Sequence, residues 1–194
     1  MIVQANINHY GIAAVAAITA MTFTGQNYGA GKKNRIMSGI KYIFLLEFLT
    51  WLIGASICVL FGEAIFKIFT DDVEVINYAK LCMLFDIPCY WALASSLAMT
   101  SVIRGMGRSK AASIIFVANM CGMRQLWILF ANAQNMGVQG VLLSYPISWI
   151  LTLAGTLLYT LYLKKLGEFN ENTDKREKLL FKYFKEFRAS IKNL

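Results

Sequence analysis

Two carboxylates lie inside long apolar runs of the sequence, where an acid has few ordinary uses. Glu47 is near the middle of the run 36–61, and Asp86 lies in the run 81–103 beside Pro88, which should kink that run. A charged side chain at membrane depth is costly, so an acid there is a functional hypothesis by default. Either acid is a candidate to exchange protons or to hold Na⁺ while an organic cation binds and leaves. The alternatives are an ion pair with a neighbouring helix for Glu47 and a boundary acid for Asp86.

Further polar and aromatic side chains in the apolar runs are candidates to line a cavity for a cation. Aromatic rings attract cations through their faces, and a buried arginine pairs with an acid or with helix-end carbonyls. The cavity candidates are Asn119, Arg124, Tyr90 and Tyr145. Packing between helices, hydrogen bonds across helices and an interfacial aromatic belt are the competing explanations.

Motifs of soluble enzymes are incomplete in this sequence. A phosphate-binding loop ending at Gly31-Lys32 would need glycine at position 26 and Ser or Thr at position 33, which hold Gln and Lys. The single histidine, His9, has no partner at metal-ligand spacing and leaves no Ser/His/Asp or Cys/His set. We therefore expect no enzyme activity, no metal site and no cofactor other than a coupling ion.

Composition indicates a membrane protein. The chain of 194 residues is 57% hydrophobic and 15% charged, whereas a soluble domain is about 25% charged. The net charge of +8 is gathered between the apolar runs and in the tail. Membrane orientation and anionic lipid explain such clusters better than nucleic acid does.

The apolar runs predict an all-α polytopic membrane helix bundle of about five transmembrane helices over residues 1–165. The first span is the weakest, because its apolar core covers only residues 12–24 and a span needs about 20 residues. The expected spans are 11–28, 36–61, 81–103, 111–131 and 140–163.

The charges of the connectors predict the orientation. Basic connectors at 32–41, 104–110 and 164–165 alternate with acidic or uncharged ones at 62–80 and 132–139. This pattern places the C-terminus in the cytoplasm and the protein in the cell (inner) membrane. The tail, 166–194, has the pattern of a basic amphipathic helix that lies on anionic lipid. A soluble helix that packs on another protein is the alternative.

Four short motifs resemble the multidrug and toxic compound extrusion (MATE) transporters. The stretch Gly25-Gln26-Asn27-Tyr28-Gly29-Ala30-Gly31-Lys32, followed by Arg35, is similar to the "GQNYGAGK..R" signature of that family. The other motifs occur in family order and are Ile65 to Ile76, Ile103-Arg104-Gly105-Met106-Gly107-Arg108-Ser109, and Gly137 to Val141 followed by Pro146.

The resemblance implies a fold and an activity. Members have two six-helix bundles and export organic cations and xenobiotics by alternating access, coupled to H⁺ or Na⁺. The motifs fall on helices eight to twelve of the second bundle. Helix eight looks shortened, and the acid of helix ten in the cation-coupled branch lies nearer the Arg-Gly turn than Asp86 does. Asp86 therefore does not simply inherit that role.

The sequence thus predicts part of a cation-coupled antiporter, with the missing N-terminal bundle and a small amphipathic cation as partners. One alternative is a flippase of the same superfamily for a lipid-linked substrate, although only Arg124 is a deep cation. The others are a truncated product without function and, least favoured, a membrane-embedded enzyme.

Overall fold

The computed structural model of the chain describes residues 2–169, and side chains from residue 13 onward. Within this part every regular element is helical, as the apolar runs predicted. The elements in chain order are α1 (Ile2–Gly29), α2 (Lys33–Lys67), α3 (Val73–Asp86), the short 3₁₀ helix η1 (Ile87–Cys89), α4 (Tyr90–Gly105), α5 (Ser109–Val117), the π-helical segment η2 (Ala118–Met123), α6 (Arg124–Ala133) and α7 (Gly137–Lys165).

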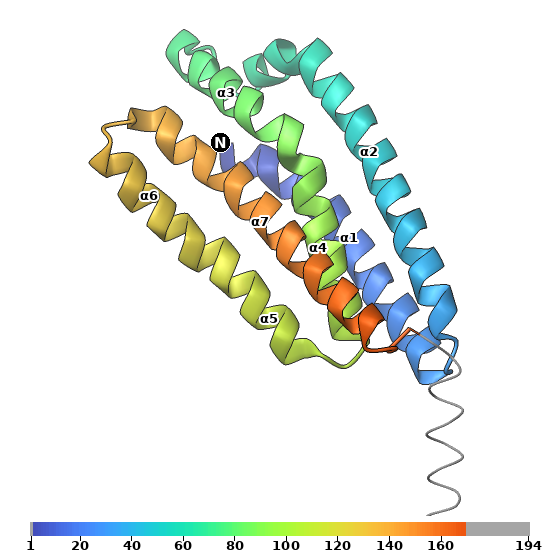
Figure 1. Ribbon diagram of the computed structural model, residues 1–194. Helices are drawn as coiled ribbons and strands as arrows, with labels where there is room; N and C mark the ends of the chain where they lie inside the picture. The colour runs from blue at the N-terminus through green and yellow to red at the C-terminus, as the bar shows by residue number, and fades with distance from the viewer. Residues whose placement is uncertain (1, 170–194) are drawn as a thin grey trace, which may run out of the picture.

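The helices run side by side and form one elongated bundle (Figure 1). The α1–α2 and α4–α5 turns and the end of α7 lie at one end of the bundle, and the α2–α3 and α6–α7 turns lie at the other. The first end carries the basic connectors at 32–41, 104–110 and 164–165. The bundle is therefore basic at one end, and its other end has the acidic connector between α2 and α3.

Four helical stretches are long and apolar enough to cross a membrane: Lys33–Lys67, Val73–Gly105, Ser109–Ala133 and Gly137–Lys165. These stretches correspond to four of the five expected spans. The fifth expectation, 11–28, falls within α1, which is continuous over 28 residues and about 42 Å long. Helix α1 is not among the four stretches, which were sought in the described residues only. A span at 11–28 stays a prediction.

The connector expected at 62–80 is mostly helical. Helix α2 continues to Lys67 and α3 begins at Val73. Both helices therefore extend past the apolar runs into the charged region. Asp72 caps the start of α3, since its Oδ1 accepts hydrogen bonds from the backbone N–H groups of Glu74 (2.9 Å) and Val75 (3.4 Å). An acid at this position also complements the positive end of the helix dipole.

Two expected spans contain irregular helix. The 3₁₀ turn Ile87–Cys89 contains Pro88 and separates α3 from α4, as the missing N–H of proline would cause. The π-helical segment Ala118–Met123 interrupts the fourth span, and the apolar pattern gave no sign of it. Such π segments occur often at functional sites.

Helix α4 forms the centre of the bundle, and most of its residues from Ala92 to Ile103 are buried. Helices α1 and α7 pack on either side of it (Figure 1). Small residues let α1 and α4 approach closely: a Cβ atom added to Gly105 would lie 2.6 Å from the carbonyl oxygen of Met21 and 2.9 Å from Thr24 Cβ. The glycine of the Arg-Gly turn is thus required by the crossing of two helices.

Glycines also end three helices at the basic end of the bundle. Gly31, Gly107 and Gly167 have φ values of 71°, 79° and 80°, which residues other than glycine rarely adopt. At Gly31 the backbone N–H donates to Tyr28 O (3.1 Å), and the next N–H, of Lys32, donates to Asn27 O (2.8 Å). This pair of bonds is the Schellman motif, and it recurs at Gly107 and Gly167.

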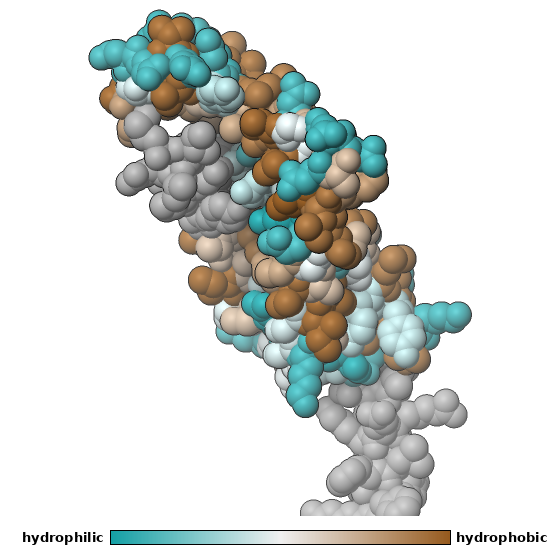
Figure 2. All heavy atoms as spheres, turned by 90° about the vertical axis from the view of Figure 1, so that its left-hand side faces the viewer, coloured by the Kyte–Doolittle hydropathy of each residue, from teal (hydrophilic) through white to brown (hydrophobic). Residues whose placement is uncertain are grey.

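Much of the outer surface is hydrophobic. Figure 2 shows such residues over the side of the bundle where α5 and α6 lie. Exposed side chains there are Ile114, Val117, Leu126, Leu129 and Phe130. A surface of this kind suits lipid or another apolar partner and not water. The tail 166–194 was expected to be amphipathic, and from residue 170 onward it lies outside the described residues.

Candidate functional site

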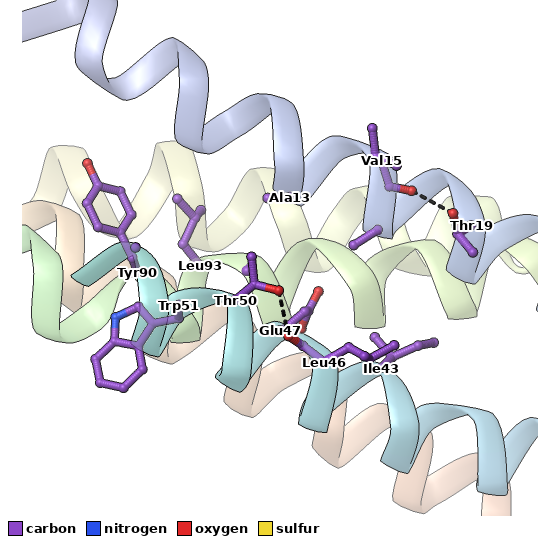
Figure 3. Close-up of a pocket in the computed structure, with 13 residues that line it drawn as sticks. Ala13, Val15, Thr19, Ile43, Leu46, Glu47, Thr50, Trp51, Tyr90 and Leu93 are labelled. Carbon is purple, nitrogen blue, oxygen red and sulfur yellow. Dashed lines mark hydrogen bonds between the residues drawn. The ribbon is translucent and has the colours of Figure 1, made fainter. Parts of the chain in front are cut away.

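A pocket of about 310 Å³ lies between α1, α2 and α4. Its walls are apolar except for a few oxygen-bearing side chains, of which Glu47 is the only acid in the lining (Figure 3). The lining residues are Ala13, Val15, Ala16, Thr19, Ile43, Leu46, Glu47, Thr50, Trp51, Gly54, Tyr90, Leu93 and Ala94. Apolar walls with a few placed polar groups are typical of small-molecule sites.

Glu47 lies deep in the bundle. It is fourteen residues after Lys33, the first residue of α2, which corresponds to about 21 Å along the helix. The hydrocarbon core of a bilayer is about 30 Å thick. This position along α2 places Glu47 far from both ends of the helix. The side chain is also only 6% exposed.

The Glu47 carboxyl group has no conventional partner. Neither of its oxygen atoms makes a hydrogen bond of ordinary geometry within the described part of the chain, and the same holds for Ser95 Oγ. The Ser95 hydroxyl, on the neighbouring helix α4, nevertheless lies near the carboxyl group. Ser95 is itself fully buried. An ion pair with a neighbouring helix, the alternative considered for Glu47, is not found among the described salt bridges.

The other oxygen-bearing residues of the pocket serve their own helices. Thr50 Oγ1 donates to Leu46 O (2.7 Å) and Thr19 Oγ1 donates to Val15 O (2.9 Å). Both bonds are drawn in Figure 3. Their hydroxyl protons are therefore committed to helix carbonyls, and only their lone pairs are open to a ligand.

Asp86, the second candidate acid, is not part of the pocket lining. Its Oδ1 atom is buried without a hydrogen-bond partner, and the positive charge of Arg124 acts on it. Arg124 is held by α7: its Nη2 atom donates to Ser148 Oγ (2.8 Å), and its guanidinium lies 4.5 Å from the centre of the Tyr145 ring. Asp86 and Arg124 thus belong to a second polar group, which is not part of the pocket that Glu47 lines.

Of the four cavity candidates, only Tyr90 lines the pocket. Its ring stacks on Trp149, with centroids 5.4 Å apart, and Tyr145 meets the same indole edge-on at 6.1 Å. Asn119 donates to Ile115 O within its own helix (2.8 Å). The aromatic row formed by Tyr90, Trp149 and Tyr145 therefore connects the pocket with Arg124. The sequence had predicted a single cavity for the four candidates.

Sequence reasoning did not single out Ser95 or Thr50 for the site. Small polar residues in apolar runs usually join helices, so the residue type of Ser95 does not mark it as part of a site. Its spacing from Glu47 in sequence gives no signal, since the two residues lie on different helices. Trp51 also lines the pocket, and its Nε1 atom donates to Ile87 O (2.7 Å), which joins α2 to η1.

The family-signature residues lie at the basic end, far along the helices from the pocket. Asn27 Nδ2 donates to Phe23 O (2.8 Å), Gln26 and Arg104 are exposed, and Gly29 has open space around it. Gly25 faces Gly105, with 3.6 Å between the position of an added Cβ and Gly105 O. These residues shape helix ends and a helix crossing, and they do not line the pocket.

A carboxylate joins the helices at this end. Glu168, just after α7, accepts a hydrogen bond from the Tyr28 hydroxyl (2.8 Å) and forms an ion pair with Arg108. Burial lowers the pKa of the Arg108 guanidinium, but its interactions with Tyr159 and Glu168 outweigh this effect and raise the pKa above its ordinary value. We call Tyr28, Arg108 and Glu168 the basic-end clamp.

The geometry defines a polytopic membrane bundle with a buried acid in a mostly apolar pocket between α1, α2 and α4. The sequence model of the MatE family matches residues 1–131, which is more than half of the chain. The chain therefore belongs to the MatE family, which is a family of transporters and not of enzymes. No curated protein sequence matches the chain, and no solved structure matches it.

Proposed function

We propose that this chain contributes a helix bundle to a cation-coupled antiporter that exports organic cations by alternating access. The observation that carries the proposal is Glu47, a buried carboxyl group in an apolar pocket that has no ion-pair partner among the described side chains. A lipophilic cation needs apolar walls for its body and one negative charge for its head. Trp51 and Tyr90 add aromatic surface to the same pocket.

The charge of the pocket supports a cationic ligand over an anionic one. Among the described residues, Arg124 is the deep cation of the bundle, and it is engaged with Ser148 and Tyr145 and does not line the pocket. A flippase for an anionic lipid-linked substrate would be expected to direct cations into its cavity. We propose further that a second bundle closes the open side of the pocket, as the two-bundle plan of the family implies.

Ethidium efflux from cells that express the chain tests the proposal. We expect efflux by the parent chain, loss of efflux in Glu47→Gln, and unchanged efflux in Glu63→Gln. Glu63 is the matched control because it lies on the same helix, exposed and paired with Lys67 and Lys80. Asp86→Asn should reduce efflux less than Glu47→Gln, because Asp86 lies outside the pocket.

Two results would contradict this proposal. No efflux by the parent chain, with or without a co-expressed first bundle from a relative, would rule out the transport assignment. Parental efflux in both Glu47→Gln and Asp86→Asn would show that neither acid is the coupling site. Membrane levels of each variant, measured by immunoblot, distinguish loss of activity from loss of protein.

A further inference from the structure

We infer that the hairpin of α6 and the first part of α7, residues 124–145, moves as one body about two hinges, and that the Arg124 side chain holds it in its present position. The hinges are the π-helical segment Ala118–Met123 and Pro146. The inference goes beyond the proposed function and does not rest on it. Three features lead to it: the placement of the two helix breaks, the packing inside the hairpin and the unmet hydrogen bonds beside the hinges.

The two helix breaks lie at the same level of the bundle. Arg124, the first residue after the π segment, donates from Nη2 to Ser148 Oγ (2.8 Å), two residues past Pro146. Its guanidinium also lies 4.5 Å from the ring centre of Tyr145, the residue before Pro146. Sharp kinks in helices occur at π segments and at proline, which removes a backbone hydrogen bond. Each arm of the hairpin therefore has a break, and the two breaks lie side by side.

The two arms of the hairpin are tightly joined to each other. Helix α6 and the first part of α7 run side by side (Figure 1), and Trp127 Nε1 donates to Gly140 O across them (2.9 Å). A Cβ atom added to Gly140 would lie 3.0 Å from Ala131 Cβ and 2.6 Å from Met136 Cβ. Such close approach leaves the arms little freedom to slide past each other. A movement at the hinges is therefore expected to carry both arms together.

The outer side of the hairpin offers little resistance to movement. The main contacts of α6 are with α7 and the π segment, and its large side chains Leu126, Leu129 and Phe130 are more than half exposed. In a bilayer these side chains meet fluid hydrocarbon. A tilt of the hairpin then exposes no apolar surface to water, whereas the same tilt in a soluble protein would.

Two buried polar atoms beside the hinges have no hydrogen-bond partner within residues 13–169: Arg124 Nε and Ser144 Oγ. Ser144 is 1% exposed and lies two residues before Pro146. In contrast, the Ser148 hydroxyl, just past Pro146, donates to Tyr145 O (2.8 Å). A buried polar group without a partner is costly. Both unmet groups belong to the hairpin, so a second position that supplies their partners would lie close in free energy to the present one.

Arg124 is suited to hold the hairpin in place. Its bond to Ser148 crosses the Pro146 hinge, whereas the Tyr145 ring, which its guanidinium faces, belongs to the hairpin itself. Helix α6 has 10 residues and is about 15 Å long. A tilt of about 20°, the size of a sharp kink, would move the tip of the hairpin by about 5 Å.

Distances between spin labels, measured by pulsed electron paramagnetic resonance, test the inference. The labels are attached to exposed positions of a cysteine-free full chain in lipid nanodiscs. The first pair joins the hairpin tip to α2, the second lies within the hairpin, and the third lies at the basic end. The substitutions are Gln134→Cys with Ala64→Cys, Gln125→Cys with Val138→Cys, and Lys110→Cys with Lys164→Cys. We expect the first distribution to extend over about 5 Å more than the other two.

Three variants of the labelled chain separate the hinge from its latch. Ser148→Ala removes the bond to Arg124 and should shift the first distribution away from the present position. Pro146→Ala supplies an N–H donor to the helix and should narrow the first distribution. The matched control is Thr156→Ala, which removes a buried hydroxyl of α7 that donates to Thr152 O and not across the hinge. It should leave all three distributions unchanged.

Any of three results would overturn the inference. The first pair in the parent chain is as narrow as the other two; the pair within the hairpin is as wide as the first; or neither Ser148→Ala nor Pro146→Ala changes the first distribution. Because these two variants are expected to act in opposite directions, a general loosening of the bundle does not imitate both. Should either fail to fold, as judged by its helical circular dichroism, Arg124→Gln replaces it and should shift the first distribution as Ser148→Ala does.

Discussion

At the scale of single residues, the carboxylates of this chain differ in what surrounds them. Within the described part of the chain, Glu47 is buried without a conventional partner, Glu63 is paired in an exposed position, and Glu168 joins separate helices through Tyr28 and Arg108. Burial without a partner is costly, and so it is the feature that indicates function at Glu47. Glu63 and Glu168, which have partners, have structural roles instead.

The basic-end clamp leads to a prediction about stability. Glu168→Ala removes an acceptor of the Tyr28 hydroxyl and the ion-pair partner of Arg108. The side chains of Arg108 and Glu168 are 36% and 23% exposed. Solvent screening therefore limits the expected loss in the free energy of unfolding to about 1 kcal/mol. We expect a lower thermal midpoint in detergent, with the difference shrinking at high salt.

The control for the clamp is Glu63→Ala, which removes a more exposed pair of interactions and should change the midpoint little. A double-mutant cycle with Tyr28→Phe measures the coupling between Tyr28 and Glu168. If the two changes add without coupling, the hydrogen bond between them contributes nothing, and the clamp is reduced to its ion pair.

At the scale of the helices, α1 and α4 cross closely at Gly105, where an added Cβ atom would meet the backbone of α1. The crossing brings two signature motifs together, since Gly25 lies on α1 and Gly105 on α4. The role of Gly105 is steric at this point, whereas a Cβ atom on Gly25 would make an ordinary contact of 3.6 Å with Gly105 O. The small side chains along both helices, such as Ala20 and Ala98, are fully buried or nearly so.

Gly105→Ala tests this crossing. The added methyl group would lie 2.6 Å from the backbone oxygen of Met21, and backbone cannot yield as a flexible side chain does. We expect a loss of about 1–3 kcal/mol, typical of overpacking, seen as a lower melting temperature in detergent. Gly29→Ala is the matched control, because no atom lies within 4 Å of its added Cβ. Equal stability of both variants would show that the crossing does not depend on glycine.

At the scale of the whole molecule, the two ends of the bundle differ in charge. The Schellman turns of α1, α4 and α7 lie at the same end as the basic connectors, and the Asp72 cap lies at the opposite end. The excess of Lys and Arg predicts that the first end faces the cytoplasm.

Single cysteines introduced into a cysteine-free chain test this orientation. A cysteine in place of Asp71 should react with an impermeant thiol reagent added outside intact cells. A cysteine in place of Lys110 should react only after the cells are opened. The reverse pattern would contradict the orientation, and the membrane-permeant reagent, which labels both sites, controls for their accessibility.

The predictable part of the fold followed from local patterns. The apolar runs gave the helices, and Asp72 gave the start of α3, because a cap acts on the next few residues of its own chain. Pro88 marked the interruption before α4 for the same reason. The π segment at Ala118–Met123 left no such mark, since its composition fits an ordinary span.

The candidate site was predictable only in part. Glu47 could be chosen from the sequence, because an acid within an apolar run is conspicuous whatever surrounds it. Ser95, Thr50 and the split between Glu47 and Asp86 could not be chosen, because they depend on how α1, α2 and α4 pack. By itself the sequence determined a membrane helix bundle of this family with buried acids, through hydropathy, charge and motif. Only the tertiary structure decided which acid has a pocket and which has a cation, because that depends on contacts between residues far apart in the chain.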